Sequence, residues 1–218
     1  MKSTGFVCRA HNPRWAFAPD SGQGAASVGG RFNPVGMPAL YTALRFETAW
    51  LEAQQAFPFK AQPMTLCVYE VDCEDVLDLT DTATLAVHGI TPADLACPWK
   101  DLSTRGIKPP SWEITERLFE AKAAGVIVPS FAKGAVATDV NVVFWVWAPH
   151  PPHQVRVIDD DQRLPKDSRS WRWATRSDHS RVARPFGSAL TDPGRRLHRT
   201  RLFPEVTRIV PHAVSKDE

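Results

Sequence analysis

The sequence has little cysteine, and no spacing of cysteine or histidine in it indicates a metal site. Its 218 residues include only four cysteines, none of them in a CxxC pair. Neither a zinc site nor a disulfide framework is therefore predicted, and we expect reduced thiols. The seven histidines also lack the HExxH spacing of metalloproteases. The sequence thus predicts no bound metal.

Long hydrophobic runs are absent as well. No stretch reaches the length of a membrane-spanning helix, and the N-terminus lacks the apolar segment and small-residue cleavage site of a secretory signal. These absences predict a cytoplasmic protein without membrane attachment. Walker A and GxSxG sequences are missing too, and the GxG at residues 22–24 has Ser27 where a dinucleotide fingerprint needs a third glycine.

The composition is that of one globular domain followed by a segment of different charge and amino-acid content. Residues 1–171 carry 16 basic and 19 acidic side chains, whereas residues 172–218 carry ten and five. The second segment is rich in Arg, Pro and Gly without a sustained period, which is typical of a disordered extension. No paired aromatic platform or known motif in it indicates nucleic-acid binding. We therefore expect a catalytic domain over 1–171 and a basic C-terminal extension over 172–218.

Within residues 1–171 the hydrophobic period changes repeatedly, which predicts an α+β fold rather than a regular alternation of strands and helices. The predicted strands cover residues 6–9, 39–44, 64–71, 76–79, 126–128, 140–147 and 154–158. A loop is predicted over residues 12–28. One helix is expected to begin after Thr91, and another to run over residues 111–124 and end at Gly125.

A further helix is predicted from residue 46 to residue 57. Its apolar residues recur at intervals of three and four and predict a buried face. These residues are Phe46, Ala49, Trp50, Ala53 and Phe57. Glu52 flanks that face and can point into a pocket, so we assign it a chemical role. Glu47 lies near the helix N-terminus, where the helix dipole favours a carboxylate, and we assign it a structural role.

Residues 29–36 (GGRFNPVG) form the most informative motif of the chain. Paired glycines let a backbone approach a ligand closely, and the guanidinium of Arg31, which lies between these glycines and Asn33, offers a planar fork of donors suited to a phosphate. Taken alone, a motif of this kind is more often an ordinary turn with a solvent-facing Arg than an anion site. The order Arg31, Tyr41, Glu52 favours the first interpretation, because a phosphate ligand, an aromatic platform and one carboxylate suit a dinucleotide whose glycosidic bond is cleaved.

Several ordered blocks of sequence resemble the RES-domain family. These blocks are residues 29–36 (GGRFNPVG), 38–42 (PALYT), 47–52 (ETAWLE), 66–72 (LCVYEVD), 94–99 (DLACPW), 125–131 (GVIVPSF), 141–144 (NVVF), 163–165 (RLP) and 170–171 (SW). The Arg, Glu and Ser that give the family its name match Arg31, Glu52 and Ser130. The resemblance implies a mostly antiparallel β core with flanking helices, similar to ADP-ribosyltransferase toxins.

The resemblance also implies an activity and partners. RES proteins are NAD-consuming toxins paired with an Xre-type antitoxin, so NAD is expected as substrate, without a metal. The products would be nicotinamide and an ADP-ribosyl group passed to a protein acceptor, water or phosphate. The antitoxin is expected to cover the site within a homo- and hetero-oligomer, and nucleic acid to be reached only through the antitoxin. The alternative is a catalytically silent nucleotide-binding or antitoxin-interaction protein.

Five residues are the expected site. Glu52 would stabilise the oxocarbenium-like ribose, and Arg31 would hold the pyrophosphate. Tyr41 would stack on nicotinamide or ribose, although its position equally suits a half-buried strand aromatic. Ser130 would position the nicotinamide ribose or amide by a hydrogen bond. Arg9 is a weaker candidate for a second phosphate contact, since an exposed charge explains this residue better than a ligand contact does.

Overall fold

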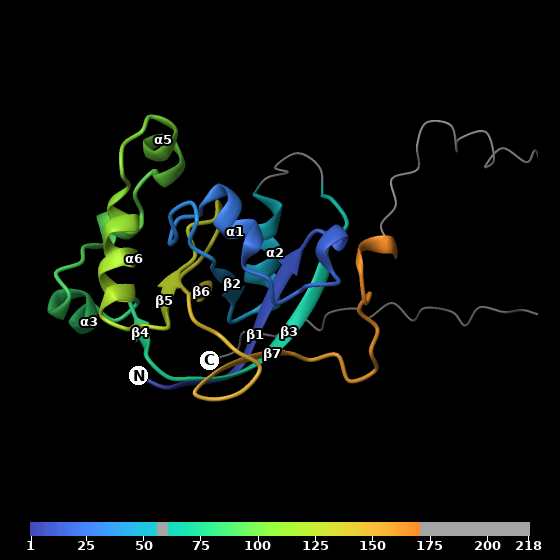
Figure 1. Cartoon of the computed structure of the whole chain (residues 1–218). Helices are drawn as coiled ribbons and strands as arrows, with labels where there is room; N and C mark the ends of the chain where they lie inside the picture. Colours follow the sequence, from blue (N-terminus) through green and yellow to red (C-terminus); the bar gives the residue numbers. More distant parts are fainter. Residues whose placement is uncertain (56–60, 171–218) are drawn as a thin grey trace, which may run out of the picture. The chain divides into compact units, whose positions relative to one another are not determined.

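The computed structural model describes residues 1–55 and 61–170 (Figure 1). These residues all belong to the first of two units of the chain, Met1–Trp173. The predicted extension 172–218 and the predicted core residue Phe57 lie outside the described residues. All four cysteines lie inside them and are free thiols.

A seven-stranded sheet forms the centre of this unit (Figure 1). Its strands are β1 (Ser3–His11), β2 (Leu40–Ala43), β3 (Thr65–Cys73), β4 (Val76–Asp78), β5 (Gly125–Pro129), β6 (Val140–Phe144) and β7 (His153–Val157). They lie in the order β4-β5-β6-β2-β1-β3-β7. Every neighbouring pair is antiparallel except β4 and β5. The predicted α+β class with a mostly antiparallel sheet is confirmed.

Short helices flank the sheet. They are α1 (Gln23–Val28), α2 (Phe46–Gln54), α3 (Thr82–Val87), α4 (Pro92–Leu95), α5 (Trp99–Thr104) and α6 (Pro110–Glu120), with 3-10 turns at Pro13–Trp15 and Ser168–Ser170. The predicted start after Thr91 is confirmed, because Thr91 and Asp94 cap each other's backbone amides at the start of α4. The predicted loop 12–28, by contrast, contains α1.

The predicted end of α6 at Gly125 is wrong. The helix stops at Glu120, and Lys122 takes a left-handed conformation with φ of 70° that turns the chain back. Gly125 instead opens β5, where the backbone of Val143 and Phe144 on β6 leaves no room for a side chain. The glycine is needed for close strand pairing rather than for a helix end.

The predicted apolar face of α2 is correct at Ala49, which is buried, and wrong at Phe46 and Trp50. Phe46 and Trp50 are 57% and 42% exposed, and the buried residues of the helix are Thr48 and Ala49. The helix packs against β1, β2 and β6 through these small side chains. Glu52 lies four residues after Thr48, on the same helical face, so it points toward the sheet.

Apolar side chains pack on both faces of the sheet. On one face, leucines and isoleucines of the segment from α3 to α6 pack against β5 and β6, and these helices lie together beside β4 and β5 in Figure 1. A second cluster joins β1, β3, β6 and β7 and includes Tyr69 and Phe144, both fully buried. Strand β6 ends at Phe144 rather than at residue 147, because the next two amides both donate to the Ala124 carbonyl.

Candidate active site

A cleft of about 630 Å³ lies over the middle strands of the sheet. Its floor follows from the strand register, which places Cys8 opposite Ala43, Ala43 opposite Asn141, and Asn141 opposite Val128. Directly opposed residues share one face of a sheet, so these four side chains form a row across β1, β2, β6 and β5. All four line the cleft. Its volume is in the range of small-molecule sites.

Glu52 of α2 stands on the wall of this cleft. Its Oε1 accepts hydrogen bonds from Ser130 Oγ and from Asn141 Nδ2, each at 2.6 Å. Its Oε2 accepts a hydrogen bond from Gln55 Nε2. Three donors therefore fix the orientation of one carboxylate at the edge of the cleft, and hydrogen bonds to a charged acceptor are among the stronger kinds.

Ser130 and Asn141 reach Glu52 because β5 and β6 are paired. Pro129 lies opposite Val140, and one step further the Ser130 amide donates to the Asp139 carbonyl at 2.8 Å. The predicted hydrogen bond of Ser130 to the nicotinamide ribose or amide stays a prediction. The contact of Asn141 with Glu52 was not predicted from the sequence. The available signal is a polar residue inside the otherwise apolar strand sequence VNVVF.

Arg31 also lines the cleft and belongs to a different part of the chain, the turn of residues 29–36. Its Nη1 donates to the carbonyl oxygens of Leu95 at 3.1 Å and Cys97 at 2.6 Å. Its guanidinium carbon lies 4.5 Å from the centre of the Phe131 ring, within cation–π range. Both hydrogen bonds use Nη1. Within the described part of the chain, the N–H groups of Nη2 and Nε make no hydrogen bond to the protein and can bind a ligand. Burial lowers the pKa of Arg31 and the nearby Glu52 opposes that shift.

The glycine-rich turn is built around Tyr41 and Asn33. The Tyr41 hydroxyl accepts from the Phe32 amide at 2.9 Å and donates to Asn33 Oδ1 at 2.8 Å. A side chain at Gly30 would collide with both the Tyr41 hydroxyl and Asn33. The close approach that Gly30 permits is thus to Tyr41, rather than to a ligand as the sequence suggested.

Asn33 itself does not offer donors to a phosphate. It is fully buried, and its Nδ2 donates to the carbonyl oxygens of Ala25, Pro34 and Met37. The side-chain amide of Asn33 therefore holds the turn together. Burial raises the pKa of the Tyr41 phenol, which keeps the hydroxyl protonated in its role as donor.

Two residues of β1 complete the polar wall of the cleft. Arg9 lines it, and its Nη1 donates to the carbonyl oxygens of Pro19 at 2.9 Å and Ser21 at 3.1 Å. His11 lines it as well, with both ring nitrogens buried and without a hydrogen-bond partner among the described residues. Burial, assisted by the charge of Arg9, lowers the pKa of His11 to about 4. Its imidazole is therefore neutral at pH 7, and no sequence pattern had indicated it.

The structure thus brings four of the five predicted site residues to the lining of one cleft, and Ser130 to Glu52 on its wall. Trp99 and Lys100 of α5 also line the cleft. Glu47 lies elsewhere: it is exposed in the first turn of α2, with its Oε1 3.2 Å from Arg45 Nη2. A hydrogen bond from its own backbone amide lowers the pKa of Glu47, as its assigned structural role at a helix start requires.

Within residues 1–55 and 61–170, no group of three or more His, Cys, Asp and Glu side chains could hold a metal ion. No helix in the same residues combines the length and apolar character that crossing a membrane requires.

A comparison of the sequence with known protein families gives a match. The family model described as RES domain matches residues 6–167, a span that contains Arg31, Glu52 and Ser130. The chain belongs to the RES-domain family. Within this RES domain, the match also covers Arg9, Tyr41 and Asn141.

No curated protein matches the chain. Among solved structures, the RES domain is similar to a chain of the crystal structure of the M. tuberculosis MbcT–MbcA toxin–antitoxin complex. The two chains share 20% sequence identity with a TM-score of 0.47, over 73% of this chain and 84% of that chain.

Proposed function

We propose that this RES domain cleaves the bond between nicotinamide and ribose in NAD. The observation that carries the proposal is the carboxylate of Glu52, held at the edge of a cleft by three donors, with the guanidinium of Arg31 lining the same cleft. One oriented carboxylate suits a reaction in which positive charge develops on a sugar. A cation with unused donors suits a substrate that carries a pyrophosphate.

The reaction has a simple electron balance. The C–N bond to C1′ of the ribose breaks, and its electron pair goes to the ring nitrogen, so that nicotinamide leaves as a neutral molecule. The ribose then carries oxocarbenium-like positive charge, which Glu52 stabilises while it accepts a hydrogen bond from a ribose hydroxyl. An acceptor with a lone pair, which is water, phosphate or a protein side chain, forms the new bond at C1′ and releases its proton where it carries one.

The other cleft residues have roles in binding. Nη2 and Nε of Arg31 bind the pyrophosphate, while Nη1 keeps its contacts to the wall. Arg9 adds positive charge near the same group. The ring of Tyr41 packs against nicotinamide or ribose, and the Ser130 hydroxyl, already on Glu52, lies within reach of the nicotinamide ribose.

We further propose that the protein is the toxin of a toxin–antitoxin pair, held inactive by an Xre-family antitoxin that covers the cleft. Membership of the RES-domain family supports this proposal. The physical reason is that an enzyme that consumes NAD harms its own host unless it is inhibited. Purified together with the product of the adjacent reading frame, the toxin should release no nicotinamide, and a fully active complex would contradict coverage of the cleft.

The test of the activity uses the purified full chain and NAD. We expect release of nicotinamide, followed by chromatography. Parallel reactions in buffer, in phosphate and with labelled NAD in cell lysate identify the acceptor from the mass or the label of the ADP-ribosyl product. Binding of NAD without nicotinamide release in any of the three reactions would overturn the proposal in favour of a catalytically silent nucleotide-binding protein.

The chemistry is proposed to reside in residues 1–171. The family match ends at residue 167, and every cleft residue precedes it. A chain shortened after Trp171 should therefore release nicotinamide at the rate of the full chain and melt at nearly the same temperature. A loss of activity or of stability would show that the catalytic domain extends beyond that residue.

A further inference from the structure

Helix α2 and strand β6 meet at two matched polar contacts. Thr48 and Glu52 lie four residues apart on α2, which is a rise of about 6 Å. Asp139 and Asn141 lie two residues apart in extended chain at the start of β6, which is a rise of about 6.6 Å. Thr48 bonds to Asp139 and Glu52 bonds to Asn141. Because the two spacings are nearly equal, both contacts form only when the helix has one position along the strand.

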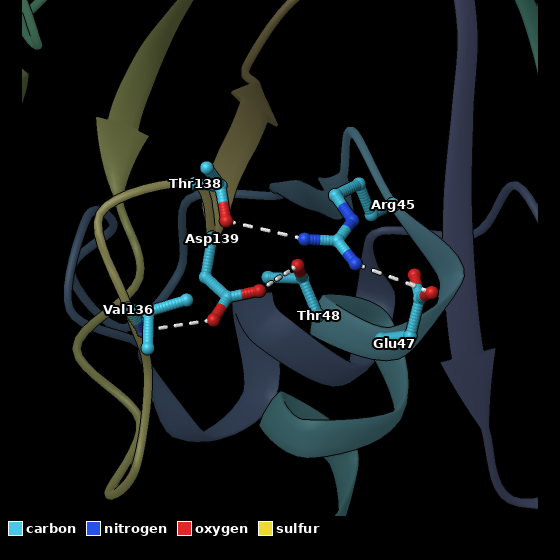
Figure 2. Close-up of polar contacts among 6 residues, drawn as sticks. All are labelled: Arg45, Glu47, Thr48, Val136, Thr138 and Asp139. Atoms are coloured by element: carbon cyan, nitrogen blue, oxygen red, sulfur yellow. Dashed lines mark hydrogen bonds and ion pairs between the residues drawn. The ribbon is translucent and has the colours of Figure 1, made fainter. Parts of the chain in front are cut away.

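The first of these contacts lies away from the cleft and is buried. Thr48 Oγ1 donates to Asp139 Oδ1 at 2.5 Å, and the two residues are 0% and 7% exposed. Asp139 Oδ2 accepts from the Val136 amide at 2.8 Å, which ties down the loop between β5 and β6 (Figure 2). The carbonyl of Asp139 accepts from the Ser130 amide. One aspartate thus contacts α2, its own loop and the strand end that carries Ser130.

A second set of contacts near α2, those of Arg45, is exposed to solvent rather than buried. Arg45 donates to Thr138 at 3.2 Å and pairs with Glu47, and these side chains are exposed (Figure 2). Exposed ion pairs contribute little, because solvent screens them and ordering long side chains costs entropy. The position of α2 therefore depends on the buried contact between Thr48 and Asp139.

We propose that Thr48 and Asp139 are positioning residues, which fix α2 along β6 so that Glu52 meets Ser130 and Asn141 in the orientation that the reaction needs. This inference rests on the proposed function for its kinetic consequence, but its structural consequence can be measured without NAD. A misplacement of about 1 Å at a reacting group costs on the order of a hundredfold in rate, so a small slip of α2 has a measurable effect.

The kinetic test compares three substitutions. Thr48→Val removes the hydroxyl and keeps the shape, and we expect it to lower kcat for nicotinamide release about tenfold with an unchanged KM for NAD. Thr48→Ser retains the hydroxyl and should restore most of kcat. Thr84→Val is the matched control, since it removes another Thr–Asp bond, to Asp81 on α3, and it should leave kcat unchanged. Wild-type kcat in Thr48→Val, or an equal loss in Thr84→Val, would overturn the proposal.

The second test needs no substrate. The side-chain amide signals of Asn141, assigned by their loss in Asn141→Asp, report its hydrogen bond to Glu52 in NMR spectra of the free protein. In Thr48→Val they should move toward the positions of unbonded amides, and in Thr84→Val they should stay. Unchanged Asn141 signals in Thr48→Val would overturn the proposal. If the wild-type protein releases no nicotinamide, the proposed function fails and this experiment still decides the inference.

A second variant guards against a folding defect in Thr48→Val. Asp139→Asn keeps the size of the side chain but leaves one oxygen for two donors, Thr48 Oγ1 and the Val136 amide. It should shift the Asn141 signals in the same direction as Thr48→Val and lower kcat without a change in KM. A folded Asp139→Asn protein with wild-type Asn141 signals and kcat would contradict the proposal.

Discussion

The two charged residues of the cleft are held in opposite ways. The hydrogen-bond partners of Glu52 are side chains. Two of them, Ser130 and Asn141, are remote in the sequence, 78 and 89 residues from Glu52. The partners of Arg31 are two backbone carbonyls of one segment and the face of one aromatic ring. A single substitution can therefore remove one side-chain donor of the Glu52 carboxylate. The backbone carbonyls that accept hydrogen bonds from the Arg31 guanidinium are present whatever side chains the segment carries.

The contacts of Glu52 orient its carboxylate, whereas the contacts of Arg31 stabilise the wall of the cleft. Each donor on Glu52 adjusts the direction and charge of a carboxylate whose helix is already packed on the sheet. Arg31, in contrast, joins the turn of residues 29–36 to the segment before α5, so its loss affects the shape of the wall as well as the binding of a ligand. We therefore expect changes around Glu52 to affect the rate, and changes at Arg31 to affect both affinity and stability.

The largest effect is expected from Glu52→Gln. The substitution keeps the shape but removes the charge that faces the oxocarbenium-like ribose, and the loss of one such contact costs on the order of a hundredfold or more in rate. Nicotinamide release should fall by that factor, while the melting temperature changes little. Glu47→Gln, on the same helix but exposed, is the control and should remain active. A Glu52→Gln protein with wild-type activity would remove the basis of the site assignment.

Arg31 tests the other half of the comparison. Arg31→Ala should weaken NAD binding at least tenfold and also lower the free energy of unfolding by about 2 kcal/mol, because charged hydrogen bonds to two carbonyls are lost. Arg31→Lys keeps the charge without the planar fork and should fall between the two proteins. Calorimetry with a slowly reacting NAD analogue and urea unfolding measure the two effects. Equal affinity and equal stability of all three proteins would show that Arg31 is a surface residue.

A smaller effect is expected from the donors on Glu52. Ser130→Ala and Asn141→Ala should each lower kcat about tenfold with little change in stability, since each leaves Glu52 with its remaining donors. Both act on Oε1, so the double variant should lose less than the product of the two single losses. Single-turnover kinetics give the comparison. Fully multiplicative losses would mean that the two donors act on separate groups.

The smallest effect is expected on the pH dependence of stability and comes from His11 of β1. This residue lines the cleft and has no hydrogen-bond partner among the described residues. Its pKa in the folded protein is lowered to about 4 from an ordinary value of 6.5, so as the pH falls the unfolded chain binds the proton first. This group therefore favours folding less and less as the pH drops from about 6.5 to about 4. The wild-type melting temperature should decrease over that range, and less so in His11→Gln. Identical decreases in both proteins would refute this origin of the pH dependence.

The sequence predicted the strands well and the buried face of α2 only in part, for a physical reason. Strands such as β3 and β7 were found because an alternating or apolar run is decided locally. The predicted stripe of α2 includes Ala49, which is buried, but also Phe46 and Trp50, which are exposed, because tertiary packing selected the small residues Thr48 and Ala49 to approach the sheet. The same packing turns Glu52 toward the sheet, whereas its catalytic role stays a prediction.

The residues expected to form the site came from the motif order and the family resemblance. The structure brings Arg31 and Glu52 to the lining of one cleft and Ser130 into a hydrogen bond with Glu52, while their roles toward a ligand stay predictions. Asn141 was missed, because its partner Glu52 is 89 residues away in the sequence and only the packing of α2 on β6 brings the two together.

The most direct test of the account is a crystal structure of the Glu52→Gln protein with NAD. We expect the dinucleotide in the cleft over β1, β2, β5 and β6, with a hydroxyl of the nicotinamide ribose at about 3 Å from the side-chain oxygen of residue 52, within hydrogen-bond distance. The pyrophosphate should contact Nη2 or Nε of Arg31. NAD bound outside this cleft, or bound in it with the adenosine rather than the nicotinamide ribose at residue 52, would contradict the assignment of Glu52 as the carboxylate that faces the bond to be broken.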